Sequence, residues 1–240
     1  MAILFISDLH LSPERPEVTR AFLRFLEDQT NSTEALFILG DLFEAWVGDD
    51  DNCPAGADVQ QAFKQLTDKG VALFIQHGNR DFFLGKRFMQ ATGATLLADE
   101  HLVEYDDQTV LVMHGDTLCT DDVDYIRFRR KIRHPITKFC LQLLPLKYRQ
   151  KLASNMRAKS KAANANKPSE IMDVNSVAVD RVMSKHQVKT LIHGHTHRPN
   201  RHQHKQGERI VLGDWHDKGW YVIWDTSDLQ LKHFDIEVSG

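Results

Sequence analysis

Five short apolar segments, each ending abruptly in a polar cluster, constrain the fold of this sequence more than any other feature. They are AILFISDLH (2–10), ALFILGDLFE (35–44), VALFIQHGNRD (71–81), TVLVMHGDTL (109–118) and KTLIHGHTH (189–197). Each has the length of a strand, is rich in Ile, Val, Leu and Phe, and lacks alternation of polar and apolar positions. That pattern predicts strands that are buried on both faces.

Helix-like segments lie between these strands. In 16–29 the residues Phe22, Phe25 and Leu26 have helical spacing, and the segment 59–70 ends in Gly70, which favours helix termination. Strands that alternate with helices predict an α/β layered fold. After residue 205 the closely spaced segments 209–216, 219–226 and 229–236 indicate an antiparallel closing sheet, so that the sheets would be mixed.

Residues 120–170 interrupt the alternation. We predict no strand there, only helices broken by Pro135, Pro145 and Pro168. Between Tyr125 and Glu170 there are 13 Lys or Arg residues and one acidic residue, although the whole chain has a net charge of −3. We therefore expect a single domain over 1–240 that carries a basic helical insertion over 120–170, and a negatively charged partner for that insertion.

The remaining composition excludes several classes of protein. The three cysteines, Cys53, Cys119 and Cys140, are far apart in sequence, and no two of them form a CxxC motif. This spacing fits a protein of the reducing cytosol better than a disulfide framework. Asp8 interrupts the apolar N-terminus, so we expect no signal peptide, and no segment approaches the ~20 apolar residues of a spanning helix. The net charge predicts no nucleic-acid affinity for the molecule as a whole.

Polar residues follow the apolar segments wherever those segments end. The set comprises Asp8, His10, Asp41, Asn79, His114, His195 and His197. Since the carboxyl ends of strands in open α/β sheets converge on one crevice, these side chains can meet. Seven ligands are too many for one ion but suit two ions with an Asp between the ions. Oxygen and nitrogen donors without sulfur fit Mn²⁺, Fe²⁺ or Zn²⁺ better than Ca²⁺. Such ion pairs activate water and hold phosphoryl oxygens.

Each fragment also has a simpler interpretation. The DxH pair could be a cap beside a buried polar group, GD could be a turn, and HGN could be a turn with Asn in a left-handed conformation. However, DxH, GD, GNxD, HGD and GHxH occur in order, each closing an apolar strand. That order favours a metal site over five unrelated turns.

The series SDLH, GDLFE, HGNRD, MHGD and HGHTH resembles the calcineurin-like metallophosphoesterase superfamily. Longer segments resemble one family within it, the UDP-2,3-diacylglucosamine hydrolases, which are pyrophosphatases of lipid A biosynthesis. These segments run through most of the chain: ILGDLFEAWVGDDD, HGNRDFFLGKRF, MHGDTLCTDD, MRAKSKAAN, IMDVN and LIHGHTHRP. The resemblance implies a layered sandwich of mixed sheets flanked by helices, with residues 120–170 as a helical lid.

The resemblance also implies a dinuclear Mn²⁺ site. Asp8, His10 and His197 would hold one ion, Asn79, His114 and His195 the other, and Asp41 would bridge them and so take part in catalysis. The implied reaction is hydrolysis of UDP-2,3-diacylglucosamine to UMP and 2,3-diacylglucosamine 1-phosphate. His193, two positions nearer the strand than His195, is interpreted as structural.

Arg80 departs from the wider superfamily, most members of which have histidine after GN. An arginine cannot usefully donate a proton near neutral pH, but it can grip phosphate oxygens in a fixed fork. A phosphate leaving group has little need of a general acid, so Arg80 fits catalysis of diphosphate cleavage. The alternative is an ion pair between Arg80 and Asp81.

A stripe of polar residues in the insertion is predicted to face the substrate. Arg157, Ser160, Asn164 and Lys167 are spaced 3, 4 and 3 apart, so they share one helix face. Asp122 and Tyr125 lie near the metal site in sequence. The resemblance implies substrate contacts for Arg80, Asp122, Ser160, Asn164, Lys167 and His195; we add Asn79, Tyr125 and Arg157. The alternative is a solvated helix face.

The segment 136–152 is both basic and apolar, with Ile136, Phe139, Leu143, Leu144 and Leu146 between basic residues. It reads either as a membrane-surface element or as the packing face of the insertion's own helices. Because the family's substrate carries acyl chains, we expect a cytoplasmic protein attached peripherally to the cytoplasmic face of the inner membrane.

Two other functions compete with the lipid hydrolase. A metallophosphoesterase nuclease or nucleotide phosphodiesterase is compatible with the basic insertion, but the apolar segment and the acidic remainder of the chain speak against it. A non-catalytic interaction protein would be expected to have lost ligands, whereas every expected ligand position is filled.

Overall fold

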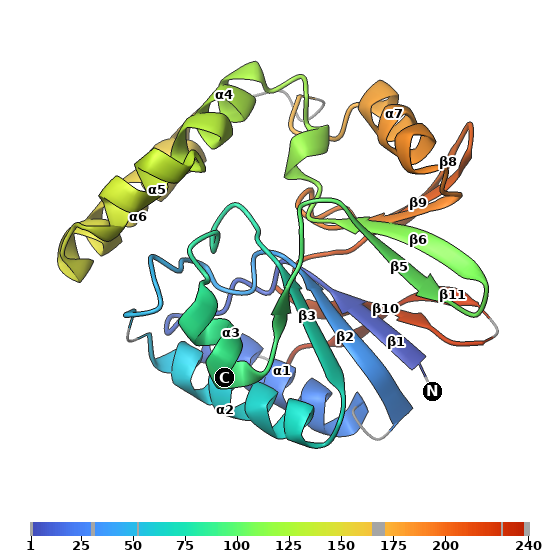
Figure 1. The fold of residues 1–240 in the computed structure, drawn as a ribbon, viewed down its shortest axis with the longest axis horizontal. Helices are drawn as coiled ribbons and strands as arrows, with labels where there is room; N and C mark the ends of the chain where they lie inside the picture. The colour runs from blue at the N-terminus through green and yellow to red at the C-terminus, as the bar shows by residue number, and fades with distance from the viewer. Residues whose placement is uncertain (1, 30–31, 52, 165–170, 227, 238–240) are drawn as a thin grey trace.

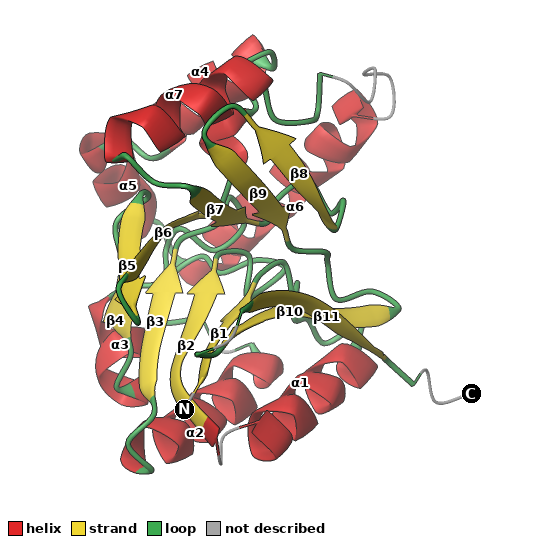
Figure 2. Cartoon of the chain, turned by 90° about the vertical axis from the view of Figure 1, so that its right-hand side faces the viewer, coloured by secondary structure: helices red, strands yellow, loops and turns green. Residues whose placement is uncertain are grey.

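Two β-sheets stack face to face in the computed structural model, which describes residues 2–29, 32–51, 53–164, 171–226 and 228–237, and helices cover their outer faces (Figures 1 and 2). The first sheet has the order β11-β10-β1-β2-β3-β4. Its strands are β1 (Ala2–Ile6), β2 (Thr33–Leu39), β3 (Ala72–Gln76), β4 (Thr95–Leu96), β10 (Lys218–Trp224) and β11 (Leu229–Asp235). Parallel pairing of β1, β2 and β3, and antiparallel pairing of β1 with β10, make it a mixed sheet.

The second sheet is also mixed and has the order β5-β6-β7-β9-β8. It contains β5 (His101–Tyr105), β6 (Gln108–Met113), β7 (Thr190–His193), β8 (Asn200–His204) and β9 (Gly207–Val211). β7 lies between β6 and β9 and is parallel to both. The five strands predicted from the apolar segments are therefore confirmed as β1, β2, β3, β6 and β7, and the layered α/β fold is confirmed.

Three apolar clusters hold these layers together. The first joins the outer face of the first sheet to α1 (Pro16–Gln29), α2 (Pro54–Asp68) and α3 (Lys86–Thr92), and Phe22, Phe25 and Leu26 lie within it as predicted. The second fills the space between the sheets, with Phe5 and Phe37 opposite Ile192 and Ile210. The third packs α7 (Ser176–His186) on the second sheet. Burial of apolar area on both faces explains why the strands lack alternation.

The prediction of one antiparallel closing sheet after residue 205 was wrong in part. β10 and β11 do pair antiparallel in the first sheet, but β9 belongs to the second sheet and runs parallel to β7. β8 (Asn200–His204), for which the sequence predicted no strand, pairs antiparallel with β9. β8 was missed because it has no buried residue among its five, so it carries no apolar periodicity.

Three helices between β6 and β7 extend away from both sheets (Figure 1). They are α4 (Val123–Ile132), α5 (Pro135–Gln142) and α6 (Leu146–Asn164), and we call them the α4–α6 arm. The described part of 120–170 contains no strand, as predicted. Pro135 is the first residue of α5 and Pro145 directly precedes α6, positions where the missing N–H and fixed φ are tolerated; Pro168 lies outside the described residues.

The arm is attached to the rest of the protein by buried or half-buried arginines. Arg149 of α6 is 6 % exposed, donates to the carbonyl of Val47 at 2.6 Å, and forms an ion pair with Asp50. Arg133, which follows α4, donates to the carbonyl of Gly78 at 2.7 Å. Since these partners lie in the loops after β2 and β3, the arm is fixed beside the carboxyl ends of the first sheet.

Candidate metal centre

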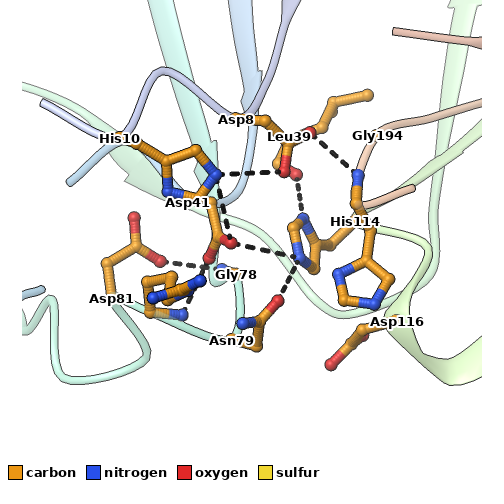
Figure 3. Close-up of polar contacts among 12 residues, drawn as sticks. Asp8, His10, Leu39, Asp41, Gly78, Asn79, Asp81, His114, Asp116 and Gly194 are labelled. Carbon is orange, nitrogen blue, oxygen red and sulfur yellow. Dashed lines mark hydrogen bonds and ion pairs between the residues drawn. The ribbon is translucent and has the colours of Figure 1, made fainter. Parts of the chain in front are cut away.

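The predicted metal ligands all lie in loops at the carboxyl ends of strands, and Figure 3 shows several of them converging. Asp8 and His10 follow β1, Asp41 follows β2, Asn79 follows β3, His114 follows β6, and His195 and His197 follow β7. Parallel strands bring these loops to one edge, so residues up to 187 positions apart become neighbours.

The backbone at this edge is unusual. Asp8, His10, Asp41, His195 and His197 all have positive φ, between 50° and 66°. A non-glycine residue rarely adopts this left-handed conformation, and such residues cluster at functional sites because the surrounding structure must hold them there. These residues stand two or four positions after the ends of β1, β2 and β7.

Glycines allow the loops to approach closely. A side chain at Gly40 would lie 2.6 Å from the backbone of Gly78, and one at Gly194 would lie 2.1 Å from Asp8 Oδ2. Backbone hydrogen bonds then join the loops, from Asp8 N to Gly40 O at 3.1 Å and from His10 N to Asp41 O at 3.0 Å. The close approach explains why the GD and HGH motifs carry glycine.

Among the described residues, two groups place potential ligand atoms within 4.8 Å of one another. The first consists of Asp8, His10 and His197, in which His197 Nε2 lies 3.3 Å from both Asp8 Oδ1 and His10 Nε2. The second consists of Asp8, Asp41 and His114, all buried. Asp8 therefore belongs to both groups.

Asp41 lies between His10 of the first group and His114 of the second (Figure 3). Its Oδ2 is 3.9 Å from His10 Nε2 and 3.8 Å from His114 Nε2. Asn79 Oδ1 is 3.0 Å from His114 Nε2, and the rings of His114 and His195 are 5.0 Å apart. The structure thus brings all seven predicted ligands together, with Asp41 in the middle.

The donors fit divalent cations. Asp8 is completely buried, and within the described parts of the chain its Oδ1 accepts no well-directed hydrogen bond. A buried carboxylate oxygen surrounded by imidazole nitrogens is costly without a cation, because burial disfavours charge. Carboxylate, amide and imidazole donors without thiolate suit Mn²⁺, Fe²⁺ or Zn²⁺.

The electrostatics of the site keep the carboxylate of Asp8 ionised. Burial alone would raise the pKa of Asp8, but His197, His114 and His10 lower it far below its ordinary value. Burial lowers the pKa of His197, whereas hydrogen bonds to Asp214 and Asp8 raise it to about 10. Burial and the neighbouring His114 lower the pKa of His195 to about 4, which leaves its imidazole neutral, the form that ligates metals.

Arg80 lies at the rim of the centre and pairs with Glu44, not with Asp81. Its Nη1 donates to Glu44 Oε1 at 3.1 Å, and its backbone N–H donates to Asp41 Oδ1 at 2.8 Å. Asp81 instead accepts from the backbone N–H groups of Gly78 and Leu42 at 2.8 Å each and is fully buried. The alternative interpretation of Arg80 as a partner of Asp81 was therefore wrong.

Tyr125 and Asp122 join the α4–α6 arm to the metal centre. The Tyr125 ring stacks on the His195 ring at 5.9 Å, and its hydroxyl donates to Asp116 Oδ2 at 2.7 Å. Asp122 caps the N-terminus of α4, where its carboxylate accepts from Tyr125 N at 3.1 Å. Arg129 of α4 also donates to Asp116, at 2.6 Å.

The predicted stripe on α6 is only partly within the described side chains. Arg157 points to the centre and donates to Glu44 Oε1 at 2.9 Å. Ser160 is exposed, Asn164 is the last residue of α6, and Lys167 lies outside the described residues. Of the two stripe members whose side chains are described, Arg157 and Ser160, Arg157 contacts the centre.

The remaining histidines lie away from the ligand groups. His193 is fully buried, with Nδ1 2.8 Å from Gly194 O and Nε2 3.2 Å from Arg209 Nη1. His77 contacts Leu84 O at 2.7 Å and so holds the loop after β3. His216 is exposed and contacts Asp217.

Three acidic residues at the centre were not predicted. Glu44 lies 3.1 Å from His10, Asp214 lies 3.4 Å from His197, and Asp116 holds Tyr125 and Arg129. Glu44 and Asp116 stand inside the motifs GDLFE and HGD, which was a usable signal. Burial would raise the pKa of Glu44, but the hydrogen bond with His10 and the charge of Arg80 lower it to about 2.

Comparison with known proteins decides the family. Residues 1–199 match the model of the calcineurin-like phosphoesterases. This chain belongs to the calcineurin-like phosphoesterase family. A solved structure described as a novel archaeal phosphodiesterase shares its fold, with a TM-score of 0.51 and 15 % identity over 98 % of this chain and 99 % of that one.

Within this calcineurin-like phosphoesterase family, close relatives are known. The chain is 51 % identical to the UDP-2,3-diacylglucosamine hydrolase of Enterobacter sp. (strain 638), over 98 % of this chain and 99 % of the relative. It is 49 % identical to the protein of the same name from Pseudomonas syringae pv. tomato, over 97 % and 96 %. The predicted membership of this group of hydrolases is confirmed, and the family implies divalent metal ions.

Proposed function

We propose that this protein hydrolyses the diphosphate bond of UDP-2,3-diacylglucosamine, releasing UMP and 2,3-diacylglucosamine 1-phosphate for lipid A biosynthesis. The observation that carries the proposal is 51 % identity over almost the full length of a hydrolase with that substrate in its name. The convergence of every expected ligand at one edge of the sheets supports it.

The centre would hold two Mn²⁺ ions. Asp8, His10 and His197 would bind one, Asn79, His114 and His195 the other, with Asp41 shared between them. When bound, such ions polarise phosphoryl oxygens and lower the pKa of water. The position of Asp41 Oδ2, nearly equidistant from His10 and His114, supports a bridging role.

Arg80 would stabilise the negative charge that develops on the diphosphate. Its guanidinium stays protonated at all physiological pH values, so it binds oxygens and transfers no proton. A nucleotide phosphate leaves as a stable anion and does not require a general acid. The hydrogen bond from Arg80 N to Asp41 supports a position close to the reacting phosphorus.

The α4–α6 arm would act as a lid within a single domain of residues 1–240, with the insertion over 120–170. Arg157, Ser160, Asn164 and Lys167 would bind the nucleotide and phosphate, together with Asp122, Tyr125, Asn79 and His195. The contact of Arg157 with Glu44 at 2.9 Å supports this arrangement, because it brings α6 to the rim of the centre. The asymmetric basic charge of the arm suits an anionic substrate.

The arm would also contact the cytoplasmic face of the inner membrane, where an acylated substrate resides. Ile136, Phe139 and Leu143 are 67 %, 62 % and 68 % exposed. They do not form the packing face of the arm's own helices, which was the alternative interpretation. None of the described helices combines the length and hydrophobicity that crossing a membrane requires.

An assay of two substrates on the purified protein tests this function. We expect UMP release from UDP-2,3-diacylglucosamine, dependent on added Mn²⁺ and abolished by a chelator, and no cleavage of single-stranded DNA. Metal analysis by mass spectrometry should give about two ions per chain. DNA cleavage without release of UMP would favour the nuclease, and inertness toward both would contradict a catalytic role.

A further inference from the structure

One carboxylate, that of Glu44, contacts three cationic or ionisable side chains from three separate parts of the fold. It lies three residues after Asp41, in the loop that follows β2. Its Oε2 is 3.1 Å from His10 Nδ1, and its Oε1 accepts from Arg80 Nη1 at 3.1 Å and from Arg157 Nη1 at 2.9 Å. Along the chain, Arg80 is 36 residues and Arg157 is 113 residues away from Glu44.

The contact with His10 bears on the orientation of its ring. With Nδ1 toward Glu44, His10 directs Nε2 toward Asp8 and Asp41, each at 3.9 Å, and toward His197. A carboxylate at the outer nitrogen of a ligating imidazole selects the tautomer and raises the basicity of the inner nitrogen. Glu44 therefore stands where it can prepare His10 for a cation.

The contact with the two arginines bears on their placement. Two guanidinium groups that share one oxygen would repel each other without it, since both remain charged. Arg80 is additionally held through its backbone, because its N–H donates to Asp41 and its carbonyl accepts from Trp46 N at 3.2 Å. Arg157 comes from the α4–α6 arm, so Glu44 connects the arm to the loop of Arg80.

We infer that Glu44 is a positioning residue with two functions, orienting His10 in the metal centre and aligning Arg80 and Arg157 at its rim. Oε2 would serve the first function and Oε1 the second. The inference rests on the proposed function, because it assigns Arg80 and Arg157 to the diphosphate. It goes beyond that function by naming one side chain that fixes both the orientation of a metal ligand and the positions of the two arginines.

Glu44→Gln tests the inference, since it keeps the size of the side chain and removes its charge. Titration of the metal-free variant with Mn²⁺ should show affinity weakened about 10- to 100-fold, the usual effect of losing an outer partner of a ligating His. At saturating Mn²⁺, kcat/KM for UDP-2,3-diacylglucosamine should remain at least about tenfold below wild type, because Arg80 is misaligned.

A double variant shows whether Glu44 acts through Arg80 or independently of it. At saturating Mn²⁺, Glu44→Gln combined with Arg80→Ala should lose clearly less activity than the two single losses added together, since the effects of contacting residues are not additive. Glu100→Gln is the matched control: Glu100 is 32 % exposed against 31 % for Glu44, and it likewise holds one histidine and one cation, His186 and Lys185. It lies outside the centre and should change neither readout.

Wild-type Mn²⁺ affinity in Glu44→Gln, or a loss that adds fully to that of Arg80→Ala, would overturn the dual role. If thermal unfolding shows that Glu44→Gln does not fold, Glu44→Asp, which keeps the charge but shortens the side chain, is expected to show the same two losses to a smaller degree. Failure of the proposed function is recognised separately, because the wild-type protein would then release no UMP.

Discussion

Arg80, proposed above to stabilise charge on the diphosphate, lies at the rim of the metal centre. Its side chain pairs with Glu44, and its backbone N–H binds the Asp41 carboxylate. Arg80→Ala should keep the metal content but lower kcat by ~10²-fold or more, the cost of removing a preorganised donor. Metal analysis and steady-state kinetics on the same samples would show both.

Arg80→His distinguishes the two chemistries at this residue. If the site requires a permanent charge, histidine should not restore the full rate near neutral pH, since its ordinary pKa is about 6.5. Recovery of wild-type turnover by Arg80→His would instead favour a general acid here.

Asp41 lies between His10 and His114, so its removal should affect both metal positions. Asp41→Ala should abolish activity and lower the content of both ions, because one carboxylate contacts both halves of the centre. Quantitative metal analysis after dialysis is the measurement, with circular dichroism as the check on folding. A variant that binds two ions and turns over normally would contradict a shared carboxylate.

The sequence predicted seven side chains that the structure brings together at one edge of the sheets, because strand ends can be recognised from local composition. It missed Asp214, whose partner His197 becomes its neighbour only through the pairing of β7 with β9 in the second sheet. The alternative that paired Arg80 with the adjacent Asp81 was wrong, because the folded chain offers Glu44, 36 residues away, and uses Asp81 to hold the loop backbone. Partners chosen by tertiary proximity leave no spacing signal.

At the scale of elements, buried strands were predictable and sheet assignment was not. The apolar segments that became β1, β2, β3, β6 and β7 carry their burial in their composition. β9 and β10 look alike in sequence, yet they join different sheets, because the pairing partner of a strand is set by packing between distant segments.

The attachment of α6 beside the centre yields a prediction for that element. Arg157→Ala should lower kcat/KM for UDP-2,3-diacylglucosamine by about 10- to 100-fold, since a charge-assisted contact contributes ~1.5–3 kcal/mol. Hydrolysis of a small activated phosphodiester that reaches only the metals should change much less. Lys159, exposed and two residues further along α6, points about 200° away around the helix, so Lys159→Ala serves as the control.

Equal losses of Arg157→Ala on the large and the small substrate would assign Arg157 to the stability of the arm and not to substrate binding. Equal activities of Arg157→Ala and Lys159→Ala would indicate that this face of α6 is a solvated surface that does not bind substrate. Hydrogen exchange of α6 in both variants would show whether the helix stays attached through Arg149, Val47 and Asp50.

At the scale of the whole molecule, charge and apolar surface are distributed unevenly. The chain has a net charge of −3, but the insertion is strongly basic. α5, in which Ile136 and Phe139 are exposed, extends away from the sheets as part of the arm (Figure 1). An apolar face flanked by Lys and Arg is suited to the interface of an anionic membrane. The acidic remainder of the molecule would be repelled by the same surface, so the arm should be the part that approaches it.

Replacing the apolar face of α5 should therefore release the protein from membranes without unfolding it. The variant Ile136→Ser, Phe139→Ser, Leu143→Ser removes three side chains spaced 3 and 4 apart on one helix face, each more than 60 % exposed. Because a fully buried apolar side chain contributes roughly 1.5–3 kcal/mol, sedimentation with vesicles of anionic lipids should fall at least about tenfold. Val177→Ser, 63 % exposed on α7, is the control and should sediment like wild type.

Raising the salt concentration should lower the sedimentation of the wild-type protein with these vesicles, since surface charge attraction is screened. Unchanged sedimentation of the triple variant would place membrane contact elsewhere on the molecule.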